Sequence, residues 1–229
     1  MTRVIAINGS PRMEEGNTAR LLSPFLEGMM AAGASVAVVY AKRLDAKPCE
    51  GDPYCWTTDP GYCFINDGMQ FLYPKLREAD ILVLATPVYT PLPGEMQNLL
   101  NRLTPLMDSR AKWSRGRTRA AGLRPDVRIS KMALVSTSGW WEKGNMETVL
   151  RIAKELARQM NISFAGALLR PHFGYLQDNS EKAEEIFDAA KQLGRQLIEE
   201  GKMSLDLLKV ISQPLISKEM WRYEIGDSD

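Results

Sequence analysis

The stretch from Ala6 to Thr18 constrains the fold of this chain more than any other segment. It continues an apolar, β-branched run, Val4 to Ile7, that is typical of a buried strand. The turn residues Asn8-Gly9-Ser10-Pro11 end that strand, and a helical pattern starts near Asn17 or Thr18, both good helix caps. A strand, a polar loop and a helix N-terminus in this order form a cradle for an anion, because backbone N–H groups and the helix dipole both favour negative charge there.

Four side chains of this loop suit a phosphate group. Ser10, Asn17 and Thr18 supply hydrogen-bond donors, and Arg12 adds a positive charge with a forked pair of donors. The alternative is an ordinary strand-to-helix turn whose polar residues only cap the helix.

Two better-known phosphate loops do not fit the segment. The P-loop requires G-x-x-x-x-G-K-[ST], whereas Glu14 stands five residues after Gly9 and no Lys-Ser or Lys-Thr pair follows. The dinucleotide fingerprint G-x-G-x-x-G fails because Pro11 occupies the position of its second glycine.

Apolar strands alternate with amphipathic helical patterns along the chain, which predicts an α/β fold. We expect strands at Val4–Ile7, Val36–Tyr40, Ile81–Ala85, Met132–Val135 and Phe164–Leu169. The alternation implies a parallel sheet with helices on both faces, a three-layer α/β/α sandwich, and five strands fit the order 2-1-3-4-5. Ligands of such sheets bind where the strand order reverses, between strands one and three.

The helices between these strands carry local signals. We expect Asp67 and Asn145 to cap two of them, and Pro24 to kink the first or delay its regular part. The last helix is expected to run to Gly201.

Two further loops follow predicted strands at the same edge of the sheet and suit a flat heterocycle. Pro87, Val88 and Tyr89 come after the third strand and offer a rigid wall with several N–H groups. Ser138, Gly139 and Trp140 come after the fourth, where the glycine permits close approach and the indole offers a stacking face.

Together these loops resemble those of the flavodoxin-like NAD(P)H-dependent FMN reductase family, in its iron-sulfur flavoprotein branch. The resemblance is carried by G-S-P-R followed by G-N-T, by T-P-V-Y after the third strand and by S-G-W-W-E after the fourth, and it covers nearly the whole chain. It implies FMN as cofactor and NAD(P)H as co-substrate. The resemblance also assigns the FMN phosphate to Ser10, Arg12, Asn17 and Thr18, and the ring to Pro87, Val88, Tyr89, Ser138, Gly139 and Trp140.

The implied function is that of an FMN-dependent oxidoreductase, which accepts hydride from NAD(P)H and passes electrons to a quinone, flavin, or other small-molecule or protein acceptor, with no side-chain acid or base required. The competing class is a flavodoxin-type electron carrier, although such carriers are strongly acidic and this chain has a net charge of +1. A third class is a nucleotide-binding regulator without redox function.

All three cysteines lie within one segment, and the resemblance implies an iron-sulfur site there. Relatives of the branch hold a [4Fe–4S] cluster with C-x2-C-x2-C and a fourth cysteine four to seven residues later. Here Cys49, Cys55 and Cys63 keep that spacing, but Asp52 stands in the second position. A carboxylate is a harder ligand than a thiolate. A four-iron cluster, a [3Fe–4S] cluster and loss of the cluster all remain open, and we favour loss or lability.

Composition and patterning define the expected organisation. We expect an FMN-binding domain over residues 1–200, with a cysteine-containing insertion at 41–66, and a tail at 201–229 that packs on a partner subunit of a homo-oligomer, a dimer or tetramer. The net charge gives no field that attracts nucleic acid or membranes. No apolar run reaches the roughly 18 residues of a membrane span. With the first strand starting by residue 4, no signal peptide is expected, and a cytoplasmic location follows.

Two further features are a basic stretch and a single histidine. The stretch Arg110 to Arg128 carries seven basic residues against one Asp, and either binds the extra phosphate of NADPH or forms a solvated connection or subunit contact. The single histidine, His172, is expected to be an ordinary loop residue.

Overall fold

A five-stranded parallel sheet forms the centre of the molecule in a computed structural model that describes all residues except 115, 177–179 and 227–229. The strands are β1 (Arg3–Asn8), β2 (Ser35–Tyr40), β3 (Ile81–Pro87), β6 (Lys131–Thr137) and β7 (Ser163–Arg170). Their order in the sheet is β2-β1-β3-β6-β7, and each neighbouring pair is parallel. This confirms the predicted order 2-1-3-4-5, with the switch between β1 and β3.

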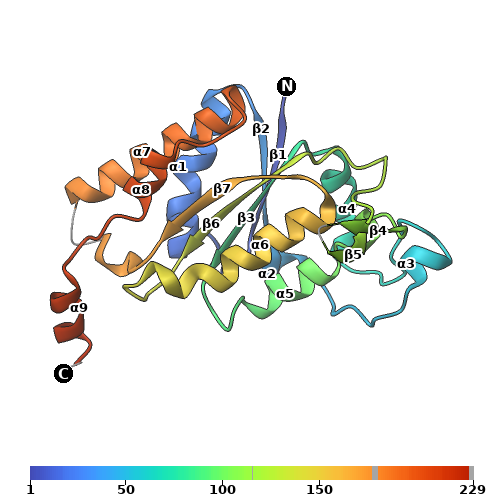
Figure 1. The fold of residues 1–229 in the computed structure, drawn as a ribbon, viewed down its shortest axis with the longest axis horizontal. Helices are drawn as coiled ribbons and strands as arrows, with labels where there is room; N and C mark the ends of the chain where they lie inside the picture. The colour runs from blue at the N-terminus through green and yellow to red at the C-terminus, as the bar shows by residue number, and fades with distance from the viewer. Residues whose placement is uncertain (115, 177–179, 227–229) are drawn as a thin grey trace.

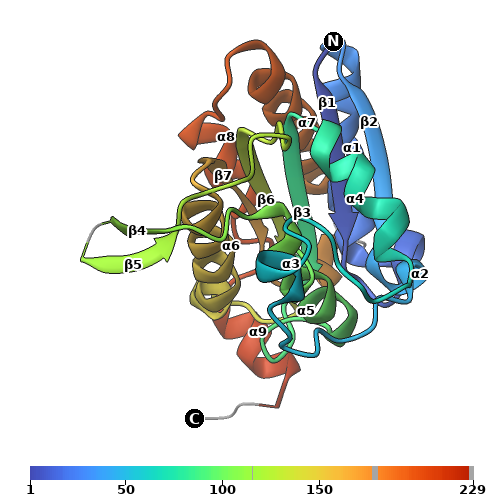
Figure 2. The same ribbon diagram turned by 90° about the vertical axis from the view of Figure 1, so that its right-hand side faces the viewer.

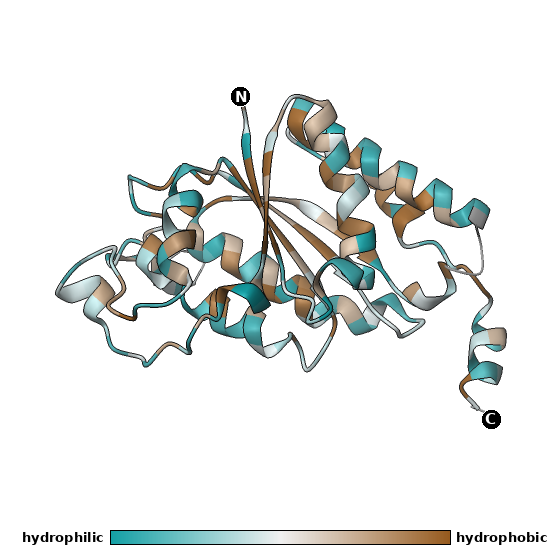
Figure 3. Ribbon diagram, turned by 180° about the vertical axis from the view of Figure 1, so that it is seen from behind, coloured by the Kyte–Doolittle hydropathy of each residue, from teal (hydrophilic) through white to brown (hydrophobic). Residues whose placement is uncertain are grey.

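Helices cover both faces of the sheet, as the α/β/α prediction requires (Figure 1). One face carries α1 (Asn17–Ala31) and α7 (Ser180–Glu199), and the other carries α4 (Met69–Glu78), α5 (Gly94–Asn101) and α6 (Glu147–Met160). Successive strand residues point to opposite faces, so Val4 and Ala6 pack under α1 while Ile5 and Ile7 pack under α4. Figure 3 shows the apolar strands enclosed by helices with hydrophilic outer surfaces.

Two predicted helix starts are wrong in detail. Helix α1 begins at Asn17 with Gly16 as its N-cap, after a short 3-10 turn η1 (Met13–Glu15), so neither Asn17 nor Thr18 caps it. Helix α6 begins at Glu147 after the turn η3 (Lys143–Met146), so Asn145 lies inside that turn rather than at the cap. Both helices are entered through a turn that adds residues before the helical hydrogen bonds begin.

Two of the other local signals have clearer outcomes. Asp67 accepts the N–H of Met69, the first residue of α4, at 2.9 Å, although Gly68 occupies the cap position. Pro24 lies inside α1, which runs as one helix through it.

The insertion at 41–66 is not wholly irregular. It contains two one-turn helices, α2 (Ala41–Leu44) and α3 (Tyr54–Thr57). Arg102, which directly follows α5 and is 1% exposed, holds the insertion in place. It donates hydrogen bonds to the carbonyl of Lys47 and to both carboxylate oxygens of Asp67. A further turn, η2 (Thr104–Leu106), packs beside α3.

The basic stretch forms a projecting hairpin that the sequence did not predict (Figure 2). Its antiparallel strands are β4 (Ala111–Ser114) and β5 (Arg117–Ala120).

The C-terminal segment contains two helices, α8 (Leu205–Ile211) and α9 (Lys218–Glu224). Helix α8 packs against α7 and β7 of its own chain, whereas α9 extends away from the body of the molecule (Figure 1). The subunit contact expected for residues 201–229 therefore stays a prediction. Exposed apolar side chains of the described tail include Leu205 in α8, Met220 and Tyr223 in α9, and Ile225 just after it. In the described part of the chain, no helix combines the length and apolar character of a membrane span.

Candidate functional site

A cavity of about 200 Å³ opens where β1, β3 and β6 end and α1 begins. Of the ten residues that the sequence predicts for the flavin, nine line this cavity, and Trp140 does not. Its lining is Ser10, Arg12, Gly16, Asn17, Thr18, Pro87, Val88, Tyr89, Thr137, Ser138, Gly139 and Phe173. Sequence reasoning missed Gly16, Thr137 and Phe173, the last of which begins the turn η4 (Phe173–Leu176) after β7.

The loop after β1 is shaped by its own hydrogen bonds. Asn8 is fully buried and accepts the N–H of Ser10 at 2.9 Å, and the carbonyl of Ser10 accepts the N–H of Met13 at 3.0 Å. The chain then passes so close to itself that a Cβ at Gly16 would lie 2.4 Å from Oγ of Ser10. A side chain at Gly16 would therefore displace the hydroxyl of Ser10. As a glycine, this helix cap carries no capping side chain.

The N-terminus of α1 is suited to an anion. Gly16 has no side chain to accept a hydrogen bond, and within the described residues the N–H groups of Asn17 and Thr18 have no acceptor. Arg12 lies at the same cavity, and no carboxylate of the described chain forms an ion pair with it. Unpaired N–H groups, a helix dipole and a guanidinium together favour a phosphate at this position.

A buried hydrogen bond fixes α1 against the sheet at the cavity. The hydroxyl groups of Thr18 and Thr137 lie 2.9 Å apart, and their residues are 1% and 3% exposed. The bond joins the first turn of α1 to the last residue of β6, so these two walls of the cavity are held in one geometry.

The wall formed by Pro87 to Tyr89 offers fewer donors than the sequence suggested. The N–H of Val88 is bound to the carbonyl of Thr137 at 2.8 Å, and that of Tyr89 to the carbonyl of Pro91 at 2.9 Å. These bonds are used to shape the loop, and proline has no N–H. The prediction of several N–H groups for the ring is therefore wrong for Val88 and Tyr89, which contribute side chains instead.

On the opposite side, one backbone donor is left for a ligand. Ser138 donates its N–H to Arg170, and Trp140 donates its N–H to the hydroxyl of Ser138 at 3.1 Å. The N–H of Gly139 has no acceptor among the described residues, and a Cβ there would meet open space. Trp140 follows Gly139 directly in the chain and is 57% exposed.

A buried network behind this loop involves residues that the sequence did not single out. Arg170 is fully buried and donates to the carbonyls of Pro171 and Ile211, at 2.7 and 2.9 Å. His172, two residues later, is 1% exposed. Its ring Nε2 accepts the N–H of Leu215, and its backbone N–H donates to the carbonyl of Trp140. The expectation that His172 is an ordinary loop residue is wrong: it links the C-terminal segment to the loop after β6.

Burial and the charge of Arg170 favour the neutral form of His172 in this network. Burial, together with the nearby charge of Arg170, lowers the pKa of His172 to about 4, and burial lowers the pKa of Arg170 to about 10. The indole of Trp141 stacks on the imidazole with ring centres 6.1 Å apart and donates to the carbonyl of Ile216. A lone histidine gives no sequence signal for such a role, because its partners come from residues about 30 to 45 positions away.

The four predicted iron-sulfur ligands line one small cavity of about 20 Å³ in the insertion, beside Arg102. Cys49 is exposed, Cys55 half-buried and Cys63 buried. Asp52 accepts the N–H of Tyr54 at 2.7 Å, at the start of α3. Burial and the neighbouring thiols of Cys63 and Cys49 raise the pKa of Cys55. Across the described residues, three or more potential ligands nowhere converge in an arrangement that would hold a metal ion.

Known proteins share both sequence and fold with this chain. The sequence model of the family described as NADPH-dependent FMN reductase matches residues 2–144. The chain is 30% identical over 101 residues to an iron-sulfur flavoprotein of Methanosarcina thermophila, which covers 44% of this chain and 51% of the relative. It is 32% identical over 105 residues to an iron-sulfur flavoprotein of Methanocaldococcus jannaschii, with 45% and 53% covered. The chain thus spans about half the length of the curated relatives it matches.

Two solved structures show the same fold at low sequence identity. An NAD(P)H:quinone oxidoreductase from Methanothermobacter marburgensis superposes with a TM-score of 0.63 at 15% identity, over 86% of this chain and 96% of that one. An FMN-dependent NADH-azoreductase from Bacillus anthracis, in complex with FMN, superposes with a TM-score of 0.62 at 12% identity, over 87% and 100%.

Proposed function

Because the chain belongs to the NADPH-dependent FMN reductase family, we propose that it is an FMN-dependent oxidoreductase. In this proposal it takes hydride from NAD(P)H and passes electrons to a quinone, a flavin or another small-molecule or protein acceptor. The observation that carries the proposal is the cavity at the switch between β1 and β3. One wall has the N-terminus of α1, which has no side-chain cap, and Arg12, which has no ion pair among the described residues; the loops after β3 and β6 form a second wall.

The residues of the cavity divide into two groups. The terminal phosphate of FMN is held by Ser10, Arg12, Asn17 and Thr18. Arg12 supplies a charge, Ser10 a hydroxyl and Asn17 an amide, and the N–H groups of Asn17 and Thr18 have no acceptor among the described residues. Bound FMN supplies hydride and electron transfer, so the protein needs to bind, orient and tune it. Pro87, Val88, Tyr89, Ser138, Gly139 and Trp140 enclose the ring, with the N–H of Gly139 as the available backbone donor.

Titration of the apoprotein with FMN tests the phosphate side of this assignment. Arg12→Ala should raise the FMN dissociation constant about tenfold or more, because a charge-assisted hydrogen bond contributes roughly 1.5–3 kcal/mol. Arg195→Ala is the matched control, since Arg195 lies on α7, outside the cavity lining. Equal affinities of the two variants would remove Arg12 from the site, and a wild-type protein that does not bind FMN would refute the proposed function.

The second candidate is a flavodoxin-type carrier, which binds FMN but does not oxidise NAD(P)H. The near-neutral charge favours the reductase over such a carrier. Steady-state oxidation of NADH and NADPH with a quinone or ferric acceptor separates them: turnover supports the reductase, and a flavin that NAD(P)H does not reduce supports the carrier. Absence of flavin binding would leave the nucleotide-binding regulator.

An iron-sulfur cluster does not fit the cysteine cavity as the described residues are arranged. The cavity is about 20 Å³, Cys49 is exposed, and the carboxylate of Asp52 is used at the start of α3. We therefore route no electron-transfer step through a [4Fe–4S] or [3Fe–4S] cluster. Iron and acid-labile sulfide analysis after anaerobic purification tests this. We expect substoichiometric iron and sulfide, and stoichiometric amounts would contradict the absence of a stable cluster.

We also propose that the protein acts as a homo-oligomer, a dimer or tetramer. Helix α9 extends from the body and exposes Met220, Tyr223 and, just beyond it, Ile225, at 54%, 85% and 52%. Such side chains suit a contact with a second subunit. Light scattering at micromolar concentration should report at least a dimer, and a monomer would refute this part of the proposal.

A further inference from the structure

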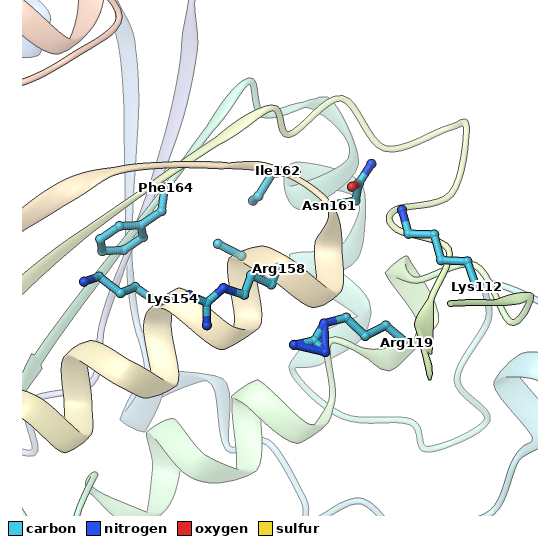
Figure 4. Close-up of a pocket in the computed structure, with 8 residues that line it drawn as sticks. Lys112, Arg119, Lys154, Arg158, Asn161, Ile162 and Phe164 are labelled. Carbon is cyan, nitrogen blue, oxygen red and sulfur yellow. The ribbon is translucent and has the colours of Figure 1, made fainter. Parts of the chain in front are cut away.

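A second, larger cavity of about 440 Å³ lies away from the flavin site, between the projecting hairpin and α6 (Figure 4). It lies beside the start of β7, whereas the flavin cavity lies beyond the ends of the strands, and the two share no lining residue. An eight-residue strand spans roughly 25 Å. The lining residues of this hairpin cavity are Lys112, Arg119, Lys154, Ala157, Arg158, Asn161, Ile162 and Phe164.

Backbone hydrogen bonds hold the two walls of the hairpin cavity together. At the base of the hairpin, Leu123 donates its N–H to the carbonyl of Met160, the last residue of α6, at 3.0 Å. Gly122, with φ of 132°, passes so close that a Cβ there would lie 2.9 Å from Cβ of Asn161. The ion pair between Arg119 and Glu155, at 3.0 Å, adds a contact higher on the hairpin. The cavity is therefore formed before any ligand arrives.

The basic side chains around the hairpin cavity form two pairs of neighbouring like charges. Lys112 and Arg119 are directly opposed across β4 and β5, and Lys154 and Arg158 are four residues apart on α6. Both spacings place like charges side by side, which costs stability. In Figure 4, Arg119 reaches from the hairpin toward the helix that carries the second pair.

One carboxylate offsets this charge only in part. Glu155 contacts Arg119 at 3.0 Å and Arg158 at 3.2 Å. Lys112 and Lys154 have no ion pair within the described residues, and no carboxylate lines the cavity. An arrangement that stability alone disfavours is expected where a ligand supplies the missing negative charge.

The C-terminal end of α6 does not cancel the attraction for an anion. Its last carbonyls would carry partial negative charge if left free. The carbonyls of Ala157, Arg158 and Met160 instead accept N–H groups from Ile162, Asn161 and Leu123. Three of the last four carbonyls of α6 are thus bonded, which reduces the negative charge at the helix end, while the lysine and arginine side chains remain.

We propose that the hairpin cavity binds a phosphorylated small molecule that carries at least two negative charges and a flat or apolar organic part. Guanidinium and ammonium groups on two walls suit a diphosphate. Ala157, Ile162 and Phe164 supply an apolar surface for the remainder, and the volume falls within the usual range for small-molecule sites. This is a second ligand site, separate from the FMN site of the proposed function.

The test is isothermal titration calorimetry of FMN-saturated protein with ADP and with pyrophosphate. Both should bind the wild type, and Lys112→Gln and Lys154→Gln should each weaken both about tenfold. Arg151→Gln is the control: it removes one charge from the exposed side of α6 outside the cavity lining, and should change affinity less than twofold. Phe164→Ala should weaken ADP and leave pyrophosphate unchanged, because only ADP has a base to lie on the ring.

Several results would overturn this assignment. The first is no heat of binding from either probe at millimolar concentration. The second is an equal loss of affinity in Arg151→Gln and Lys154→Gln, because that would indicate a diffuse charge effect. Binding of ADP to the FMN-free protein only would place the probe in the flavin cavity. Thermal melts of each variant, with midpoints matching the wild type, establish that a weakened affinity comes from the site and not from unfolding.

Discussion

Replacing Arg102 by methionine should destabilise the protein strongly, because it leaves a buried carboxylate without its partner. Arg102 is 1% exposed and Asp67 3% by side chain, with oxygen–nitrogen distances of 2.6 and 3.2 Å. Removing one member of a buried pair typically costs about 3–5 kcal/mol. The N–H groups of Lys47 and Met69 still donate to Asp67, so the lower half of that range is expected.

Differential scanning calorimetry gives the magnitude. In a domain of this size each kcal/mol shifts the melting temperature by about 2–4 °C, so Arg102→Met should lower it by roughly 6–15 °C. The control is Arg110→Met, which removes an arginine from the surface pair with Asp108, where Arg110 is 80% exposed. Surface pairs contribute little, so this variant should melt close to the wild type. A decrease in melting temperature of less than 2 °C for Arg102→Met, or equal decreases for the two variants, would refute the reasoning.

The pH dependence of the same variant adds a second check. Burial alone would raise the pKa of Asp67, but the hydrogen bonds from Arg102, Lys47 and Met69 outweigh it and leave the pKa lowered. A lowered pKa stabilises the folded protein above the ordinary value of about 4, and this contribution is lost as the pH falls through the folded pKa. Without Arg102 the folded pKa of Asp67 should be higher than in the wild type. The wild-type advantage over Arg102→Met should therefore be full at neutral pH and shrink as the pH falls through the folded pKa of the variant toward that of the wild type.

Three further predictions concern the flavin site. His172, with its pKa lowered to about 4, should make the protein progressively less stable as the pH falls from about 6.5 toward 4, since only the unfolded chain takes up the proton there; in urea titrations His172→Gln should lose this decline. Thr18→Val should cost about 1–3 kcal/mol by leaving the buried hydroxyl of Thr137 unpaired, and Thr18→Val with Thr137→Val should recover most of it in the same titrations. Gly16→Ala, whose Cβ would lie 2.4 Å from Ser10, should weaken FMN binding in fluorescence titrations, while Gly94→Ala, whose Cβ meets open space, should not.

The layered fold and most of the site could be read from local patterns. The strand runs from Val4 and Ile81 are continuous and apolar because central parallel strands are buried on both faces. Once the strand order is assumed, the loops after β1, β3 and β6 must meet at one edge of the sheet, which is why Ser10, Pro87 and Gly139 could be grouped before their distances were known.

Helix boundaries and free donors depended on hydrogen bonds that a sequence does not display. Gly16 rather than Asn17 caps α1 because the preceding turn closes on Ser10. Likewise, Val88 donates its N–H to the carbonyl of Thr137 in β6. Whether that N–H was available to a ligand therefore depended on how the loops pack.

What the sequence by itself determined was the periodic pattern and the turn chemistry, since both act between residues close in the chain. What only the tertiary structure decided was pairing across long separations. His172 became a buried link to Leu215, and a basic stretch without regular pattern became one wall of a cavity whose other wall is α6. Burial and charge convergence set these roles, and both are properties of the packed chain, because they depend on which distant residues exclude water from each group.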